Sequence, residues 1–304
     1  MKLASHSSSV DRSRVLVTGI DSFTGRHLKQ HLEQSGFCVF GTCLKNPSSS
    51  TDFVCNITDK DAIAQVLKTA RPGYVIHLAG ISFVGHPVME DFYRVNVLGT
   101  QNLLDALVES DLVLSKVILA SSATVYGNQG LAVLDESICP MPANHYGMSK
   151  LAMEHVARTY FDKLPIIVTR PFNYVGVGQP EHFVIPKIVA HFKRGEKVIE
   201  LGNVEVEREF NDVRFACEVY KRLIEIEQSG EIVNLCSSQG VALQTVIDTL
   251  NELAGYDIKV QVNPAFVRAN ELPSLVGSAD RLTRLIGEVT SIPLKTTLRT
   301  IFLA

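Results

Sequence analysis

Short apolar runs alternate with amphipathic segments through the first half of this chain. Six of the runs read as buried strands, at residues 14–18, 37–42, 53–57, 74–80, 116–122 and 166–170. The segments between them have the length and periodicity of helices. Strands that alternate regularly with helices form a parallel sheet covered on both faces. The pattern predicts an α/β fold with a doubly wound parallel sheet, whose ligands bind beyond the carboxyl ends of the strands.

The first predicted strand runs directly into a glycine-containing turn. Residues 19–25 read Gly-Ile-Asp-Ser-Phe-Thr-Gly, and an amphipathic segment follows to Gln34. Phosphate groups bind at such helix N-termini, because free N–H groups and the helix dipole favour anions. A dinucleotide-binding turn usually has a third glycine, and Ser22 stands at that position, where its Cβ could hinder close approach of the backbone to a pyrophosphate. Taken alone, the segment is also compatible with a plain strand–turn–helix.

The end of the second predicted strand bears on the choice of cofactor. Chains that bind NAD carry an Asp or Glu there, which binds the ribose hydroxyls. Here Gly41, Thr42 and Cys43 come first, and Lys45 follows. The missing carboxylate and the nearby cation favour a 2′-phosphate, and therefore NADP(H) over NAD(H). The alternative interpretation of Lys45 is a solvated loop lysine.

Tyr146 and Lys150 lie four residues apart in a segment, 146–161, that is predicted to be helical. At that spacing both side chains lie on one face of the helix. A tyrosine hydroxyl has a pKa of about 10, and a neighbouring ammonium group stabilises the phenolate and lowers that pKa. The pair therefore predicts a proton donor or acceptor that works near neutral pH. Ser122, at the end of the fifth predicted strand, is expected at the same edge of the sheet.

After Pro171 the regular alternation of strands and helices ends. We therefore predict a flexible tail at residues 1–13, a cofactor-binding domain at 14–172 plus 212–238, and a smaller α/β substrate lobe at 173–211 plus 239–304. The tail is polar and serine-rich and lacks the apolar centre of a signal peptide.

Composition argues against several classes of function. The net charge is −3 and no basic patch with interleaved aromatic residues occurs, so nucleic acid is not an expected partner. No apolar run approaches the roughly 18 residues of a membrane span. The six cysteines are scattered, without a Cys-x-x-Cys pair. We interpret them as reduced thiols of a cytoplasmic protein, and we expect no metal site.

Several motifs follow the glycine turn in order: His77-Leu78-Ala79-Gly80, Asn96, Ser121-Ser122-Ala123-Thr124-Val125-Tyr126-Gly127, Tyr146-x-x-x-Lys150 and Arg170-Pro171-Phe172-Asn173. With these motifs the chain resembles the extended short-chain dehydrogenases/reductases that act on nucleotide-diphosphate sugars. The resemblance extends from Arg14 to the end of the chain. It implies a Rossmann-type sheet with a smaller substrate lobe, and an NAD(P)-dependent oxidoreductase.

The resemblance also implies roles for individual residues. Ser122, Tyr146 and Lys150 would be catalytic: Tyr146 would protonate the substrate oxygen, Ser122 would orient it, and Lys150 would bind the nicotinamide ribose. The cofactor would contact Gly19, Ser22, Phe23, Gly25, Lys45, Asn56, Ile57, Leu78, Ala79, Gly80, Tyr146, Lys150 and Pro171. The substrate would contact Ser122, Asn173, Val184, Lys187, Arg208 and Arg268.

The two arginines suit a diphosphate because the planar guanidinium group makes two charge-assisted hydrogen bonds. Each also has a simpler interpretation. Arg208 lies in a charge-rich run, residues 205–209, which could be a solvated face. Arg268 could form a local ion pair with Glu271.

The second half of the chain narrows the resemblance. Residues 171–179, 201–203, 208–213 and 268–278 are similar to the branch that contains GDP-mannose 4,6-dehydratase and GDP-4-keto-6-deoxy-mannose reductase. The dehydratases carry a glutamate shortly after the serine of the fifth strand, whereas Ala123 and Thr124 follow Ser122 here. This favours NADPH-dependent reduction of the 4-keto group of a nucleotide-diphosphate 4-keto-6-deoxy-hexose, with a GDP-sugar preferred.

The leading alternative is an NAD-dependent nucleotide-sugar 4-epimerase, because the Ser-Ala-Thr-Val-Tyr-Gly string is similar to that of UDP-galactose 4-epimerase. A 4,6-dehydratase and a non-catalytic NADP-binding protein rank below it. By resemblance, we also expect a homodimer formed through two long helices, at residues 91–110 and 146–161.

Overall fold

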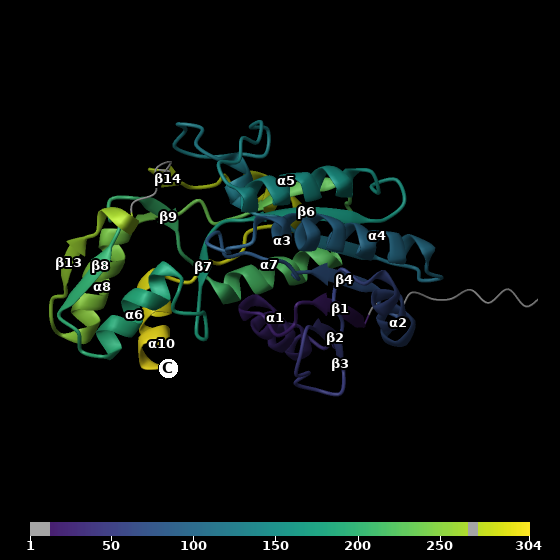
Figure 1. Cartoon of the computed structure of the whole chain (residues 1–304), viewed down its shortest axis with the longest axis horizontal. Helices are drawn as coiled ribbons and strands as arrows, with labels where there is room; N and C mark the ends of the chain where they lie inside the picture. The colour runs from purple at the N-terminus through teal and green to yellow at the C-terminus, as the bar shows by residue number, and fades with distance from the viewer. Residues whose placement is uncertain (1–12, 267–272) are drawn as a thin grey trace, which may run out of the picture. The chain divides into compact units, whose positions relative to one another are not determined.

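The computed structural model describes residues 13–266 and 273–304. Its main sheet is parallel and has seven strands, in the order β11-β6-β5-β4-β1-β2-β3. Figure 1 shows four of them, β4, β1, β2 and β3, one after another. The order reverses between β1 and β4, which is where ligands bind in open parallel sheets. The strands are β1 (Arg14–Thr18), β2 (Cys38–Cys43), β3 (Asp52–Val54), β4 (Tyr74–His77), β5 (Lys116–Ala120), β6 (Ile166–Pro171) and β11 (Glu231–Leu235). The predicted α/β fold with a doubly wound parallel sheet is confirmed.

The strands at the centre of this sheet are buried on both faces. In β1, Val15, Leu16 and Val17 are at most 1% exposed, and all four residues of β4 are buried. Burial on both faces is what covering helices produce. The helical elements of this part of the chain are α1 (Phe23–Gln34), α2 (Lys60–Ala70), α3 (Met89–Tyr93), η1 (Arg94–Gly99), α4 (Thr100–Glu109), η2 (Ala123–Tyr126), α5 (His145–Arg158) and α7 (Val213–Glu225).

The helix expected over residues 91–110 is not a single regular helix. It begins as α3, continues as a π-helical turn, η1, and ends as α4. The hydroxyl of Thr100 donates to the carbonyl oxygen of Asn96, four residues earlier, at 2.7 Å. Single π-helical turns inside helices occur often at functional sites.

The irregular second half forms small sheets and a helical core. β7 (Tyr174–Val175) pairs with β10 (Asn211–Asp212), β9 (Glu207–Glu209) lies between β12 (Gly240–Ala242) and β14 (Ser274–Leu275), and β8 (Val198–Leu201) pairs with β13 (Lys259–Val262). The helices are α6 (Val184–Lys193), α8 (Leu243–Ala254), α9 (Asp280–Ile286) and α10 (Leu294–Leu303), with a short turn, η3 (Pro264–Phe266). Side chains from α6, α8, α10 and β8, such as Ile188, Ile199, Ile247 and Leu298, share one apolar core.

Internal contacts group the chain into two compact units. Among the described residues, one comprises 13–120, Ala152–Val168 and Tyr220–Glu231, and the other comprises Ser121–Leu151, Thr169–Val219, 232–266 and 273–304. The domain boundaries inferred from the sequence remain a prediction.

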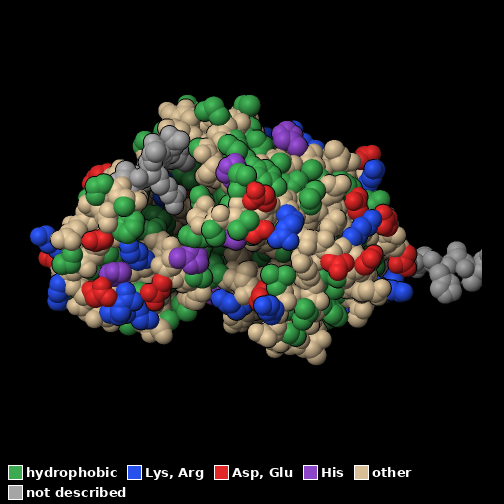
Figure 2. Space-filling view, in the orientation of Figure 1, with side chains coloured by type: hydrophobic (Ala, Val, Ile, Leu, Met, Phe, Trp, Pro, Cys, Tyr) green, Lys and Arg blue, Asp and Glu red, His purple; other side chains and the backbone are tan. Residues whose placement is uncertain are grey.

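Charged side chains of both signs are interspersed over the face drawn in Figure 2. Within the described ranges, no helix combines the length and the apolar character that crossing a membrane would require.

Candidate active site

The turn after β1 depends on glycine at two positions. Gly19 has a φ of +71°, in the left-handed region that side chains disfavour, and a Cβ there would lie 3.0 Å from the backbone nitrogen of Ala79. A Cβ on Gly25 would lie only 2.3 Å from the carbonyl oxygen of Gly19. Glycine at both positions therefore allows β1, the turn and α1 to approach one another closely.

Ser22, at the position of the expected third glycine, is the N-cap of α1. Its φ of −67° and ψ of 165° suit any residue, so the backbone does not require glycine there. Its Oγ accepts a hydrogen bond from the Gly25 N–H at 3.0 Å. Phe23 begins the helix, and the first turn contains no acidic side chain. The positive end of the helix dipole therefore remains available to a pyrophosphate.

Three residues expected near the adenosine follow β2 and β3. Lys45 is exposed in the loop after β2. The Oδ1 of Asn56 accepts hydrogen bonds from the N–H of Thr58 at 3.1 Å and from its hydroxyl at 2.9 Å. Ile57 is buried, and its Cγ2 would lie 2.7 Å from a Cβ on Gly99. Asn56 and Ile57 thus have structural roles beside their predicted contact with the cofactor.

Asp52 is the first carboxylate after β2, and it is already engaged. Its Oδ1 accepts a hydrogen bond from the Nζ of Lys29 at 2.7 Å, and its Oδ2 accepts one from the Oγ of Ser48 at 2.8 Å. Burial acts to raise the pKa of Asp52, but these hydrogen bonds outweigh it and the pKa is lowered. Residues 44–51 contain no carboxylate at all.

The segment after β4 lies against the glycine turn. The N–H of Leu78 donates to the carbonyl oxygen of Thr18 at 3.2 Å, and the N–H of Ala79 donates to the Thr18 Oγ1 at 3.1 Å. Leu78 and Ala79 are partly buried, whereas Gly80 is exposed. The structure thus brings this predicted cofactor-binding segment next to Gly19.

Ser122 and Tyr146, far apart in the sequence, are hydrogen-bonded to each other. Ser122 is the N-cap of η2, and its Oγ accepts hydrogen bonds from the Thr124 hydroxyl at 2.9 Å and from the Thr124 N–H at 3.2 Å. A hydroxyl oxygen accepts two hydrogen bonds and donates one. With both acceptor positions taken by Thr124, the Ser122 proton is directed to Tyr146.

The start of α5 explains how Tyr146 reaches Ser122. The Oδ1 of Asn144 accepts a hydrogen bond from the Gly147 N–H at 2.9 Å, which caps the helix. A Cβ on Gly147 would lie 2.8 Å from the carbonyl oxygen of Thr124. The first turn of α5 therefore packs directly on η2, with glycine permitting the close approach.

Lys150 follows one turn later on α5, on the same face as Tyr146. Both side chains are buried, at 6% and 8% exposure. The structure therefore brings the three predicted catalytic residues into one unit of the fold.

Burial is the main influence on the Tyr146 hydroxyl, and it raises the pKa above the ordinary value of 10.0. The hydrogen bond from Ser122 acts in the opposite direction and does not overcome it. Our expectation of a lowered pKa is therefore wrong for the protein chain itself. The sequence showed the spacing to Lys150 but not the depth of burial. A buried phenol that keeps its proton at neutral pH is suited to act as a general acid.

The residues expected on the substrate side lie in the same unit as Ser122. Pro171, a predicted cofactor contact, ends β6. Exposed Asn173 comes two residues later, and exposed Val184 begins α6. The carbonyl oxygen of Asn173 accepts a hydrogen bond from the Asn211 N–H at 3.1 Å. Arg208, on β9, donates from Nη1 to the carbonyl oxygen of Glu207 at 2.7 Å. Arg268 lies outside the described residues.

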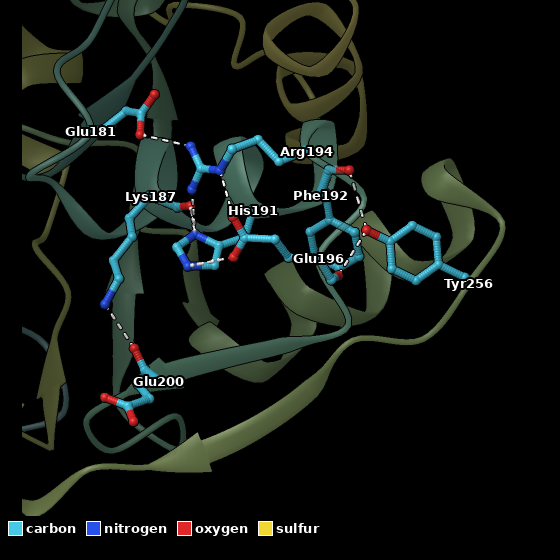
Figure 3. Close-up of polar contacts among 8 residues, drawn as sticks. All are labelled: Glu181, Lys187, His191, Phe192, Arg194, Glu196, Glu200 and Tyr256. Carbon is cyan, nitrogen blue, oxygen red and sulfur yellow. Dashed lines mark hydrogen bonds and ion pairs between the residues drawn. The ribbon is translucent and has the colours of Figure 1, made fainter.

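Lys187 is held within the unit by its own contacts. Its Nζ donates to the carbonyl oxygen of Glu200 at 2.7 Å (Figure 3), and the ammonium lies 4.5 Å from the centre of the Phe266 ring. Nearby, Arg194 forms ion pairs with Glu181 and Glu196 at 3.1 and 2.6 Å. Binding of a substrate by Lys187, which remains a prediction, would compete with its bond to Glu200.

Glu209, at the end of the charge-rich run interpreted above as a possible solvated face, is fully buried. Its Oε1 accepts a hydrogen bond from the Gly277 N–H at 2.8 Å, and its Oε2 accepts bonds from the Ser237 N–H and the Asn211 amide, each at 2.8 Å. Burial raises the pKa of Glu209, against these hydrogen bonds. The carboxyl group joins three segments next to Arg208, and no local sequence signal distinguished it from its exposed neighbours.

Tyr126, in the motif after β5, has a structural role. Its hydroxyl donates to the Asn234 Oδ1 at 2.7 Å, and the Arg170 guanidinium lies 4.8 Å from the centre of its ring. Burial raises the pKa of Tyr126 to about 12. Part of the motif therefore builds the fold rather than the reaction site.

Comparison with known proteins identifies the family of this chain. Residues 15–236 match the model of the NAD dependent epimerase/dehydratase family. GDP-6-deoxy-D-talose 4-dehydrogenase of Aggregatibacter actinomycetemcomitans is 34% identical over 275 residues, which cover 90% of this chain and 91% of that protein. GDP-6-deoxy-D-mannose reductase of Pseudomonas aeruginosa is 31% identical over 299 residues, 95% of each chain.

Among solved structures, RMD from Pseudomonas aeruginosa complexed with NADPH superposes with a TM-score of 0.84 at 28% identity, covering 96% of this chain and 97% of that one. The resemblance to the extended short-chain dehydrogenases/reductases is confirmed. The chain belongs to the NAD dependent epimerase/dehydratase family of enzymes.

Proposed function

We propose that this enzyme uses NADPH to reduce the 4-keto group of a nucleotide-diphosphate 4-keto-6-deoxy-hexose, with a GDP-sugar preferred. The observation that carries the proposal is the hydrogen bond between Ser122 and Tyr146, together with the two residues after Ser122. These are Ala123 and Thr124, where a dehydratase would have a carboxylate. Without a carboxylate, elimination of water has no evident base at that position. Two relatives support the substrate class, because their names refer to GDP-linked 6-deoxy sugars.

The side chains of this enzyme divide the proton chemistry between them. When bound, a reduced nicotinamide supplies a hydride to the carbonyl carbon. Tyr146 donates its proton to the oxygen that becomes an alkoxide. When the substrate binds, Ser122, held by Thr124, turns its proton from Tyr146 to that oxygen and orients it through a hydrogen bond. Lys150 binds the nicotinamide ribose and stabilises the phenolate that proton transfer leaves behind.

The glycine turn fits a nicotinamide dinucleotide, the cofactor class that the family uses. The preference for NADP(H) rests on exposed Lys45, on the absence of a carboxylate in residues 44–51, and on Asp52 being occupied by Lys29 and Ser48. Replacing Lys45 with alanine should weaken binding of NADPH more than binding of NADH. Equal weakening of both, measured by fluorescence titration, would remove this support.

The sugar nucleotide is proposed to contact Asn173, Val184, Lys187 and Arg208. Arg208 is the strongest of these, because it is only partly exposed and lies next to the buried Glu209. Replacing Arg208 with methionine keeps most of its aliphatic stem. It should raise the KM for the sugar nucleotide with little effect on the Kd for NADPH.

A 4-epimerase is the second candidate, because the family includes epimerases and the string from Ser122 to Gly127 suits either reaction. The two differ in cofactor turnover. A reductase consumes one NADPH for each product molecule, whereas an epimerase regenerates its cofactor within each cycle.

The test is to mix the enzyme with NADPH and a panel of 4-keto-6-deoxy sugars linked to GDP, dTDP, UDP and CDP, and to follow the nicotinamide absorbance. We expect stoichiometric oxidation of NADPH, fastest with a GDP-sugar. Replacing Tyr146 with phenylalanine should remove most turnover while NADPH binding persists. Interconversion of sugars without net NADPH oxidation would show that the main activity is epimerisation.

A homodimer is proposed through the helices that contain residues 91–110 and 146–161. Exposed apolar side chains on them, Leu98, Val108 and Met148, provide surface for such an interface. Light scattering at micromolar concentration should give twice the chain mass. A monomer there would refute the assignment.

A further inference from the structure

A chain of hydrogen bonds runs from β1 through β4 to α4. It is formed by four residues that are each at most 2% exposed: Thr18, His77, Asn96 and Thr100. The Nδ1 of His77 lies 2.7 Å from the Oγ1 of Thr18, its neighbour on the adjacent strand. The Nε2 of His77 lies 2.9 Å from the Oγ1 of Thr100. The proposed reaction leaves this buried histidine without a role.

The partner of Thr100 determines which nitrogen of His77 donates to it. The Thr100 hydroxyl donates to the Asn96 carbonyl oxygen at 2.7 Å, and a carbonyl can only accept. The Thr100 oxygen must therefore accept its bond from the His77 Nε2–H. At the other end, Thr18 Oγ1 accepts from the Ala79 N–H at 3.1 Å and donates its own proton to Nδ1. Of the two neutral tautomers of His77, these contacts therefore fit the one with its proton on Nε2.

Both ends of this hydrogen-bond network hold the segment that follows β4. Thr18 binds the Ala79 N–H, as described above. The Asn96 side chain accepts from the Ile81 N–H at 2.8 Å and donates to the Ile81 carbonyl oxygen at 3.1 Å. Three backbone groups between residues 79 and 81 are therefore held by buried side chains.

The position of this segment matters because the glycine turn lies against it. A Cβ on Gly19 would be 3.0 Å from the backbone nitrogen of Ala79, so the two stretches of backbone are close. A small shift of residues 79–81 would change the surface that the turn and the segment present together. Buried polar networks in which every member is satisfied hold one geometry in this way.

We propose that His77 is a positioning residue for the nicotinamide dinucleotide. As the neutral Nε2–H tautomer it connects Thr18 to Thr100 and holds residues 78–81 at the spacing from the glycine turn that the dinucleotide requires. It does not itself touch the cofactor. The inference rests on the proposed cofactor site.

The test compares two substitutions at His77 with a matched control. His77→Leu removes both hydrogen bonds, whereas His77→Gln supplies one acceptor and one donor. Lys116→Met is the control. Lys116 is also fully buried, and its Nζ donates to the carbonyl oxygen of Gln228 at 2.5 Å. It is the first residue of its strand, whereas His77 is the last residue of β4. The free energy of unfolding is measured for all three.

NADPH binding is measured by fluorescence titration, and amide hydrogen exchange of residues 77–83 is measured on the protein alone. We expect His77→Leu to bind NADPH about tenfold more weakly, the effect of losing one to two net hydrogen bonds. Exchange at Ala79 and Ile81 should accelerate. His77→Gln should restore much of the NADPH affinity and much of the protection from exchange. Lys116→Met should lose stability without a change in the Kd for NADPH.

Three results would overturn the inference. The first is a His77→Leu variant that binds NADPH as tightly as the wild-type protein does. This result would leave the proposed function intact. The second is an equal loss of affinity in Lys116→Met, which would trace the effect to stability alone. The third is a wild-type protein that binds no nicotinamide dinucleotide, which would overturn the proposed function as well. If His77→Leu does not fold, Thr100→Val removes the bond to His77 and the bond to the Asn96 carbonyl, and the same measurements are made on it.

Discussion

Replacing Thr124 with valine should slow the reaction by releasing Ser122 from its fixed orientation. Thr124 fills both acceptor positions of the Ser122 oxygen, from its hydroxyl at 2.9 Å and its N–H at 3.2 Å. Valine keeps the volume and the N–H but removes the hydroxyl. One acceptor position on Ser122 then opens, and Tyr146 can donate to Ser122 instead of to the substrate.

The size of the effect follows from the one bond that is lost. A neutral hydrogen bond contributes about 0.5–1.5 kcal/mol net. Because about 1.4 kcal/mol corresponds to a factor of ten in rate, kcat should fall roughly twofold to twelvefold. The KM for the sugar nucleotide should change little, since Thr124 acts only through Ser122. Steady-state oxidation of NADPH at saturating substrate measures both quantities.

Thr124→Ser is the matched control because it keeps the hydroxyl. It should retain nearly the wild-type kcat. Two results would contradict the reasoning: an unchanged kcat in Thr124→Val, or a Thr124→Ser variant as slow as the valine variant.

Three further predictions concern the turn, the fold and the proton donor. Gly25→Ala should abolish measurable NADPH binding in a fluorescence titration, because its Cβ would lie 2.3 Å from a carbonyl oxygen of the turn; wild-type affinity would refute this. Asp212 accepts hydrogen bonds from Arg214 at 2.6 Å and Thr297 at 2.8 Å, so Asp212→Asn should lower the free energy of unfolding in a urea titration by about 1.5–3 kcal/mol. Burial acts to raise the pKa of Asp212, but the bonds from Arg214 outweigh burial and the pKa is lowered below 3.8. The wild-type protein should therefore lose this stabilisation as the pH falls below 3.8. The Asp212→Asn variant should show no such loss. Because burial raises the pKa of Tyr146 above 10.0, the reductive kcat should not fall through loss of the Tyr146 proton until the pH exceeds 10.0. The reverse oxidation needs the phenolate and should accelerate as the pH rises. A reductive rate that falls near neutral pH in step with titration of Tyr146 would contradict the role of Tyr146 as the proton donor.

Local features of the sequence predicted the architecture well. The alternation of strands and helices, the glycine turn and the spacing of Tyr146 and Lys150 all depend on consecutive or nearby residues, and the structure contains each of them. The family was predicted correctly for the same reason. Ser22 shows the limit of a motif, because its position needed an N-cap rather than a glycine.

Predictions that depended on environment were less successful. Glu209 was one charge among several in the sequence, yet it is fully buried because Gly277, Ser237 and Asn211 supply donors. The direction of the Tyr146 pKa shift was wrong because burial depends on what surrounds a side chain.

The sequence by itself determined the fold class and predicted Ser122, Tyr146 and Lys150 as candidate catalytic residues, since apolar periodicity, glycine spacing and helical spacing are properties of short stretches of chain. Only the tertiary structure decided which polar groups meet. It paired Ser122 with Tyr146 and placed His77 between Thr18 and Thr100. Such contacts join residues that are distant in the chain, and their energies depend on a burial that no single segment encodes.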